Sequence, residues 1–282
     1  MNKPTIGIIG FGMVGKAIQH GFAQLCDFSI YDINPLESQN TLEEVAEDSD
    51  FIFICVPSPM NINTGKCDLS IVRDTLKKLK ELRSRAIIII KSTIPPGTTE
   101  KFREEFYPLD IVFNPEFLTA RTSKLDFINS SRIIIGGQYE ILDKVEDLYR
   151  MRFPHTPIFR TDPTTAELVK YTANTFFATK LSFFNEIYDI CEELNIDYND
   201  VIKMTIADQR IGNSHYTIPG HDGLRGYGGL CFPKDINALI YKAKELGINP
   251  IILKAVWKKN LEVRKKRDWE EIEGAISNKT DV

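Results

Sequence analysis

The sequence lacks long apolar runs and has no excess of positive charge. Its unbroken aliphatic runs are short, such as residues 86–90. A membrane-spanning helix needs about 20 consecutive apolar residues, so we expect no membrane segment. The formal net charge is -4 at pH 7. This balance disfavours binding to nucleic acid, for which a basic surface is typical.

Cysteine is scarce and scattered. The five cysteines form no CxxC pair and lie at Cys26, Cys55, Cys67, Cys191 and Cys231. This pattern disfavours a disulfide framework and a zinc site, so we expect no metal. The first four residues lead directly into an apolar run, which leaves no space for a signal peptide. We therefore expect a cytoplasmic protein.

Apolar runs alternate with amphipathic stretches through residues 1–161. The strand-like runs lie at residues 5–10, 28–31, 51–56, 86–90, 111–113, 132–135 and 157–159. Helical patterns lie between them, at residues 13–25, 69–82, 98–106 and 140–149. A capping-box pattern, Thr41 with Glu44, opens a further short helix. This alternation predicts an α/β fold with a doubly wound parallel sheet of Rossmann type, covered by helices on both faces.

A glycine motif follows the first expected strand and opens a helix. Its sequence is Gly10-Phe11-Gly12-Met13-Val14-Gly15. The first glycine makes the tight turn, the second lets a pyrophosphate touch the backbone, and the third lets helix and strand pack closely. Asp32 stands about twenty residues further on and would accept hydrogen bonds from a ribose diol. We therefore predict a dinucleotide site that favours NAD over NADP, because a carboxylate repels a 2′-phosphate.

Ligands of doubly wound sheets bind at the carboxyl ends of the strands. Three loops at these ends are rich in polar groups, at residues 55–59, 91–99 and 114–118. Proline and hydroxyl residues are also ordinary turn formers. Taken alone, Glu116 is equally compatible with an exposed or capping carboxylate.

The second half of the chain, residues 162–282, is helical in pattern. A long helix runs without a breaker to Leu194. It starts at the Asp162-Pro163 cap, or at Thr164 with Glu167 completing a capping box. Its apolar residues lie on nearly all sides, which predicts the core of a homodimer formed through residues 162–194.

Two polar features stand on the expected helices of this half. Lys170 and Asn174 are four residues apart and so share a helix face. A second helix is predicted from Pro250 to about Ile276, with the basic run 264–267 as a solvated face. We therefore divide the chain into a dinucleotide-binding domain, 1–161, and an all-helical central dimerisation domain, 162–282.

The segment Gly226-Tyr227-Gly228-Gly229-Leu230-Cys231-Phe232-Pro233-Lys234-Asp235 combines a thiol with three glycines, a lysine and an aspartate. One interpretation is a buried structural cysteine in a flexible turn. The other is a nucleophile, because backbone without side chains admits a substrate and nearby charge tunes the thiol. The segment alone leaves both interpretations open.

These motifs, in this order, resemble the UDP-glucose/GDP-mannose dehydrogenase family. The resemblance spans essentially the whole chain and is carried by residues 91–99, 114–118, 166–186 and 228–235. It implies oxidation of a sugar C6 alcohol to a carboxylate with two NAD per turnover. Among nucleotide sugars, UDP-glucose is the substrate that we expect.

The resemblance also implies roles for individual side chains. Cys231 would form a thiohemiacetal and then a thioester, which water hydrolyses. Lys170 and Asn174 would hold and polarise the oxygen on C6. Thr93 and Asp235 would position a water or transfer protons, and Glu116 would act as a base or bind substrate.

Binding roles follow from the same resemblance. Cofactor contacts are expected from Gly10, Gly12, Met13, Val14, Gly15, Asp32, Ser58, Thr93 and Lys234. Substrate contacts are expected from Glu116, Phe117, Leu118, Lys170, Asn174, Tyr216 and Gly228. Arg210 is similar to a family arginine that reaches a neighbouring subunit's site.

Three departures from the family pattern stand out. Ala120 occupies a position where the family usually has a second glutamate, and residues 33–37 offer no basic side chain beside Asp32. We also expect the family's C-terminal nucleotide-sugar-binding domain to be absent, because only residues 277–282 follow the last predicted helix. A separate chain supplying that domain is a possible partner.

Two other functions remain open. A two-electron dehydrogenase of the β-hydroxyacid type would use Lys170 as base and would not need Cys231. A non-catalytic, truncated NAD-binding subunit would explain the expected absence of a third domain. Retention of the polar residues above argues for an enzyme. The number of NADH formed per substrate distinguishes the two enzymes, because a four-electron oxidation gives two and a two-electron oxidation gives one.

Overall fold

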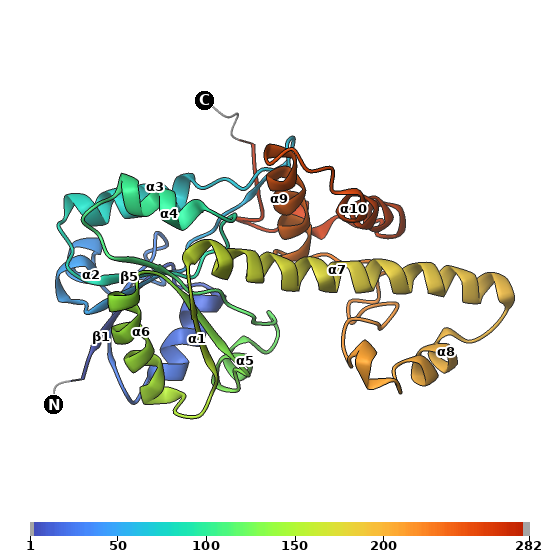
Figure 1. Ribbon diagram of the computed structural model, residues 1–282, viewed down its shortest axis with the longest axis horizontal. Coiled ribbons are helices and arrows are strands. Elements are labelled where there is room, and N and C mark those ends of the chain that lie inside the picture. Colours follow the sequence, from blue (N-terminus) through green and yellow to red (C-terminus); the bar gives the residue numbers. More distant parts are fainter. Residues whose placement is uncertain (1–2, 279–282) are drawn as a thin grey trace. The chain divides into compact units, whose positions relative to one another are not determined.

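The computed structural model describes residues 3–278, which form two compact units (Figure 1). The first unit comprises the chain up to Ser58 together with Asp68–Lys170. The second comprises Pro59–Cys67 together with the chain from Tyr171 onward. The predicted domain boundary between residues 161 and 162 stays a prediction.

The first unit is built on a seven-stranded sheet. In spatial order the strands are β2 (Asp27–Tyr31), β1 (Thr5–Ile9), β3 (Phe51–Ile54), β5 (Ile87–Ile90), β6 (Ile111–Phe113), β7 (Ile133–Gly136) and β8 (Ile158–Thr161). Neighbouring strands are parallel, except that β6 and β7 pair antiparallel. The predicted fold class, a doubly wound α/β sheet, is confirmed.

Helices cover both faces of this sheet, as Figure 1 shows. One face carries α1 (Met13–Phe22), α5 (Ser123–Ile128) and α6 (Tyr139–Arg152). The other carries α2 (Leu42–Asp48), α3 (Ser70–Glu81) and α4 (Thr98–Glu105). Successive strand residues point to opposite faces, so Ile87 and Ile89 enter one core and Ile88 and Ile90 the other. The isoleucine-rich strands therefore need both helical layers.

The sequence located most of these elements but missed α5. The predicted capping box of α2 is present, with the Thr41 hydroxyl accepting from the Glu44 amide. Helix α5 is only six residues long, and its Phe127 packs edge-on against Phe22 of α1. A helix this short has too few turns to show a clear apolar period in the sequence, so tertiary packing determines whether it forms.

The second unit is mainly helical. It contains α7 (Pro163–Leu194) from Tyr171 onward, α8 (Tyr198–Thr205), α9 (Phe232–Glu245), α10 (Ile251–Val263) and two 3₁₀ turns, Gln209–Ile211 and Asp268–Glu270. A two-stranded sheet joins β4 (Met60–Asn61) to β9 (Ile276–Ser277). The sequence did not anticipate α8, α9 or this small sheet.

The start of α7 distinguishes between its two predicted caps. Asp162 caps the helix, because its carboxylate accepts hydrogen bonds from the amide and hydroxyl of Thr165. The alternative capping box ending in Glu167 is wrong. Glu167 is fully buried and instead accepts from the amides of Gly97 and Thr99, at 2.6 and 2.7 Å. Its carboxylate thereby satisfies donors at the N-terminus of α4.

The predicted helix from Pro250 to Ile276 is too long, because α10 ends at Val263. At Arg264 the backbone becomes extended, and the guanidinium is buried rather than solvated. It lies 2.7 Å from a carboxylate oxygen of Asp222 and 2.9 Å from one of Asp268. These two carboxylates hold the Arg264 side chain in place, and a continued helix would move it away from them.

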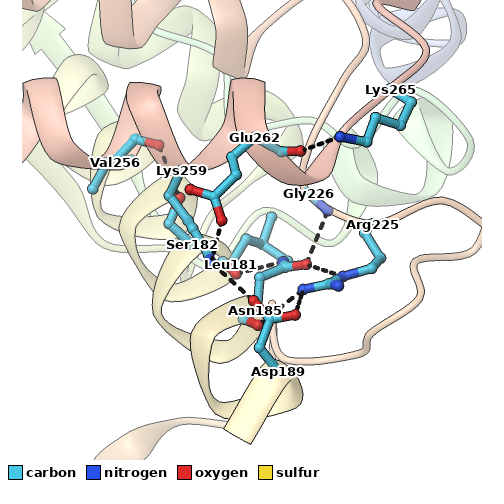
Figure 2. A network of polar contacts seen from close by, with 10 residues as sticks. All are labelled: Leu181, Ser182, Asn185, Asp189, Arg225, Gly226, Val256, Lys259, Glu262 and Lys265. Carbon is cyan, nitrogen blue, oxygen red and sulfur yellow. Dashed lines mark hydrogen bonds and ion pairs between the residues drawn. The ribbon is translucent and has the colours of Figure 1, made fainter. Parts of the chain in front are cut away.

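A second polar network joins α7, α10 and the loop before α9 (Figure 2). The Asp189 carboxylate accepts from Arg225 at 2.5 Å and from Lys259 at 2.8 Å. The Asn185 side-chain oxygen accepts from Arg225 and from the Gly226 amide. The glycine-rich segment is therefore anchored at its first residue.

We predict that Arg264→Met lowers the free energy of unfolding by about 2–4 kcal/mol, because Asp222 and Asp268 lose their shared cation. The partly exposed carboxylates keep this below the value for a fully buried pair. Urea denaturation measures the loss. The control is Arg267→Met, whose side chain is 49% exposed. Equal losses in both variants would contradict the assignment.

Candidate active site

The predicted cofactor loop connects β1 to α1. Gly10 has φ +93°, and a Cβ there would lie 2.8 Å from the carbonyl of Cys55. A Cβ on Gly15 would lie 2.5 Å from the Gly10 oxygen. Gly12 is the N-cap residue of α1, so no side chain caps the first amides of this helix. A Cβ added at Gly12 would have no atom within 4 Å. The loop thus leaves an open approach to the free amides of α1, whose first residues are Met13 and Val14.

Asp32 directly follows β2 and faces this loop. One carboxylate oxygen accepts the Phe11 amide at 2.6 Å, and the other accepts the Asn34 amide at 2.8 Å. The residues present fit a dinucleotide, because Gly12 leaves room for the diphosphate and Asp32 offers an acceptor for the ribose.

Sequence reasoning missed a cation in this region. It found no basic residue at positions 33–37, but α1 supplies Lys16, which pairs with Glu37 at 2.8 Å. The ammonium also lies 5.5 Å from the centre of the Phe11 ring. Its position directly after Gly15 was the available signal. An ion pair between Lys16 and Glu37 therefore links α1 to the loop beyond Asp32.

Glu116 and Lys170 form a buried ion pair in the first unit. The Lys170 ammonium donates to the Glu116 carboxylate and to its carbonyl, both at 2.7 Å. The second carboxylate oxygen accepts the Leu118 amide at 2.7 Å. Burial opposes ionisation of Glu116, but Lys170 holds the pKa of this carboxyl below its ordinary value. Two predicted site residues, 54 positions apart, are thus in direct contact.

A second lysine, overlooked by sequence reasoning, is buried beside this pair. The Lys91 ammonium donates to Asn114 Oδ1 at 2.7 Å and to the Pro115 carbonyl at 3.2 Å. The Tyr149 hydroxyl also donates to Asn114 Oδ1. Burial lowers the pKa of Lys91 to about 8. Its position at the end of β5, on the loop already singled out, was the signal.

The other predicted residues of the first unit lie on the same loops. Phe117 packs its ring against the Arg132 guanidinium, 4.1 Å from the ring centre, and Leu118 packs partly buried on the core. The Ser58 hydroxyl donates to the Thr93 carbonyl at 2.7 Å. The loops after β3 and β5 are thereby joined.

In the second unit, Cys231 is the N-cap residue of α9 and is partly exposed. Pro233 follows in the first turn of this helix. Gly229 has φ +75°, and a Cβ added there would have no atom within 4 Å. A helix N-terminus presents partial positive charge and favours a thiolate. The partly exposed position at a helix N-cap favours the nucleophile over the buried structural cysteine.

Asp235 joins two other predicted residues in this unit. Its carboxylate oxygens accept from Asn174 Nδ2 and Lys234 Nζ, both at 2.6 Å. All three side chains are buried. Burial opposes the charge of Lys234, but Asp235 raises its pKa, and Cys231 contributes in the same direction. Cys231, Lys234, Asp235 and Asn174 therefore form one group.

The glycine segment before Cys231 is tightly packed at Gly228. A Cβ on Gly228 would lie 2.1 Å from a carboxylate oxygen of Asp268, so only glycine fits there. Tyr216 is tied locally, with its hydroxyl donating to Asn213 at 2.7 Å. Arg210 is exposed and pairs with Asp208 within its own turn. The predicted roles of these three residues stay predictions.

Within residues 3–278, no group of three or more His, Cys, Asp or Glu side chains is arranged to hold a metal ion. No helix in that range has the length and apolarity needed to cross a membrane.

The sheet, its glycine loop and the buried lysine groups define a dinucleotide-dependent dehydrogenase fold. The sequence matches the NAD binding domain of the UDP-glucose/GDP-mannose dehydrogenase family over residues 31–152. It matches the central domain of that family over residues 164–262. The chain belongs to this family, and NAD is its cofactor. The first match begins beyond Gly15, so the glycine loop is assigned by its own geometry.

Relatives and solved structures agree with this family. The chain is 35% identical over 249 residues to UDP-glucose 6-dehydrogenase TuaD of Bacillus subtilis strain 168, covering 85% of this chain and 52% of the relative. It is 34% identical over 241 residues to the UDP-glucose 6-dehydrogenase of Campylobacter jejuni, covering 85% and 59%. A UDP-glucose dehydrogenase structure from Pyrobaculum islandicum aligns with a TM-score of 0.81 at 28% identity, covering 93% of this chain and 68% of that one. The chain thus spans about half the length of these curated relatives.

We predict that Lys234→Gln slows alkylation of Cys231 by iodoacetamide several-fold at pH 7.5, because the thiolate loses a neighbouring cation. The rate is followed by mass spectrometry of the peptide that contains Cys231. The matched control is Lys242→Gln, in the last turn of the same helix. An unchanged rate in Lys234→Gln would show that this lysine does not act on the thiol.

Proposed function

We propose that the chain is an NAD-dependent nucleotide-sugar 6-dehydrogenase, acting by itself or as part of a larger assembly, with UDP-glucose as substrate. The observation that carries the proposal is a thiol at the N-terminus of α9, grouped with Lys234, Asp235 and Asn174. A dehydrogenase that stops at the aldehyde needs no such nucleophile. The names of the relatives at 34–35% identity support the choice of substrate.

Bound NAD supplies a hydride acceptor for each of the two oxidation steps. The Lys170 ammonium steadies negative charge on the C6 oxygen as the alcohol loses its proton. Asn174, through its amide, orients the same oxygen. Thr93 positions a water molecule or takes part in proton transfer. These roles are proposals for the side chains described above.

The second oxidation depends on Cys231. The sulfur adds to the aldehyde carbon, and the thiol proton passes by way of a neighbouring base to the aldehyde oxygen, which gives a thiohemiacetal. The thiohemiacetal hydroxyl then gives its proton to the base while its carbon loses a hydride, which leaves a thioester. Water, deprotonated by Glu116 or Asp235, then attacks the thioester carbonyl, breaks the C–S bond and releases the carboxylate with the free thiol. The chain is returned to its starting state.

We expect two NADH per UDP-glucose oxidised, measured by absorbance at 340 nm with the substrate limiting and NAD in excess. A panel of UDP- and GDP-sugars tests the substrate choice. Cys231→Ser should reduce four-electron turnover by more than a hundredfold and should leave NAD binding unchanged. One NADH per substrate, insensitive to Cys231, would favour the two-electron β-hydroxyacid type instead.

Absence of turnover with every sugar would contradict the proposal that the isolated chain is active. Turnover that appears only after addition of a second chain would support a partner that supplies the remainder of the relatives' length. Absence of turnover in both settings, with NAD still bound, would favour a non-catalytic subunit.

We also propose a homodimer formed through α7. Phe176, Phe183 and Ile190 recur at seven-residue spacing along this helix and are each more than half exposed, as is Leu194. A row of large apolar side chains at this spacing matches the seam of a helix pair, and a second copy presents the same row. The occupant that fits this stripe is therefore the same helix of another chain.

We predict that Phe183→Asp halves the mass measured by size-exclusion chromatography with light scattering, because it places a charge in the apolar seam. Phe159→Asp is the control, since Phe159 is similarly exposed but belongs to β8. A monomeric mass for the unmodified chain, or an unchanged mass for Phe183→Asp, would contradict the dimer.

A further inference from the structure

Lys91 is a buried cation to which neither the family resemblance nor the proposed mechanism assigns a role. Its side chain is only 5% exposed, yet it stands at the carboxyl end of β5, where ligands of such sheets bind. Its ammonium holds the Asn114 side chain and the Pro115 carbonyl. Both contacts immediately precede Glu116 in the chain, so Lys91 fixes the backbone from which the Glu116 carboxylate projects.

Lys91 also interacts electrostatically with the Glu116–Lys170 pair. Its charge stabilises the Glu116 carboxylate and opposes a second charge on Lys170. With both lysines protonated and Glu116 ionised, the group has a net charge of about +1. Loss of one proton from either lysine leaves it neutral.

Two other titratable groups face Lys91 from neighbouring strands and helices. The Cys55 thiol follows β3, and burial raises its pKa to about 12. The Tyr149 hydroxyl belongs to α6, and burial raises its pKa above the ordinary value. Both therefore stay neutral near pH 8, the range in which Lys91 exchanges its proton.

A cavity adjoins the group and gives the proton a route. It has a volume of about 320 Å³ and is lined by Lys91, Glu116, Tyr149 and Arg132, among others. The space is large enough for several water molecules, and its lining offers them polar partners. A buried ammonium beside such a cavity can exchange its proton without opening of the fold.

We propose that Lys91 is a positioning residue: it holds the loop that carries Glu116, and its charge sets how tightly Lys170 and Glu116 hold their protons. This inference rests on the proposed dehydrogenase function for its catalytic meaning. When Lys91 is protonated, Lys170 releases its proton more readily and Glu116 stays ionised. When Lys91 is neutral, Lys170 retains its proton more strongly.

The test uses the carboxyl carbon of Glu116, observed by NMR in protein labelled with carbon-13 glutamate. Glu116→Gln identifies the signal by its loss. In the unmodified chain the signal should shift in one step with a midpoint near pH 8. Lys91→Arg keeps the charge and should hold the signal at its low-pH position. Lys91→Met removes the charge and should hold it at the high-pH position.

A step of the same midpoint in Lys91→Met, or no step in the unmodified chain, would overturn the proposal. If Lys91→Met does not fold, the comparison between the unmodified chain and Lys91→Arg decides, because arginine does not titrate in this range. In the enzyme assay, the pH dependence of kcat/KM should lose its limb near pH 8 in Lys91→Arg. The NMR result is independent of turnover, so failure of the proposed function and failure of this inference are distinguishable.

Discussion

The burial of Lys170 against Glu116 is the interaction on which the candidate chemistry of the first unit depends. A lysine taken out of water loses its hydration, and a partner must replace it. Here the ammonium donates to both the carboxylate and the carbonyl of the same residue. The loop after β6 is therefore held to the first turns of α7. Loss of Glu116 would remove this carboxylate from the buried Lys170 ammonium, and loss of Lys170 would leave Glu116 with its electrostatic interaction with Lys91.

The second unit also contains a buried charge, and a different set of partners compensates it. Asp235 is almost fully buried and is neutralised by Lys234, its neighbour in the chain, while Asn174 satisfies its second oxygen. Further along, Arg264 draws Asp222 and Asp268 together and ends α10. The glycine segment that carries Cys231 lies between these polar groups. Gly226 and Gly228 are needed there because a side chain at either position would meet Asn260, Arg264 or Asp268.

Sequence reasoning predicted the parts that depend on local pattern. The isoleucine-rich strands, the Thr41 cap and the Asp162 cap follow from periodicity and hydrogen-bonding side chains within a few residues. Glu167 and Arg264 were misinterpreted, because their partners lie 68 and 42 residues away, in Thr99 and Asp222. A capping-box pattern and a basic run describe only near neighbours. The pairings of Glu116 with Lys170 and of Asn174 with Asp235 were likewise beyond local pattern, although all four residues were named.

The two polar groups differ in net charge, and this difference would suit different steps of the proposed oxidation. Lys91, Lys170 and Glu116 leave about one positive charge uncompensated while both lysines are protonated, which favours an oxyanion developing nearby. Lys234 and Asp235 cancel one another. The positive charge that remains beside the Cys231 sulfur is then that of the amides in the first turn of α9, which the N-cap position makes available. In the proposed mechanism, a thiolate at this position would be stabilised by the backbone amides, while the charges of Lys234 and Asp235 balance one another.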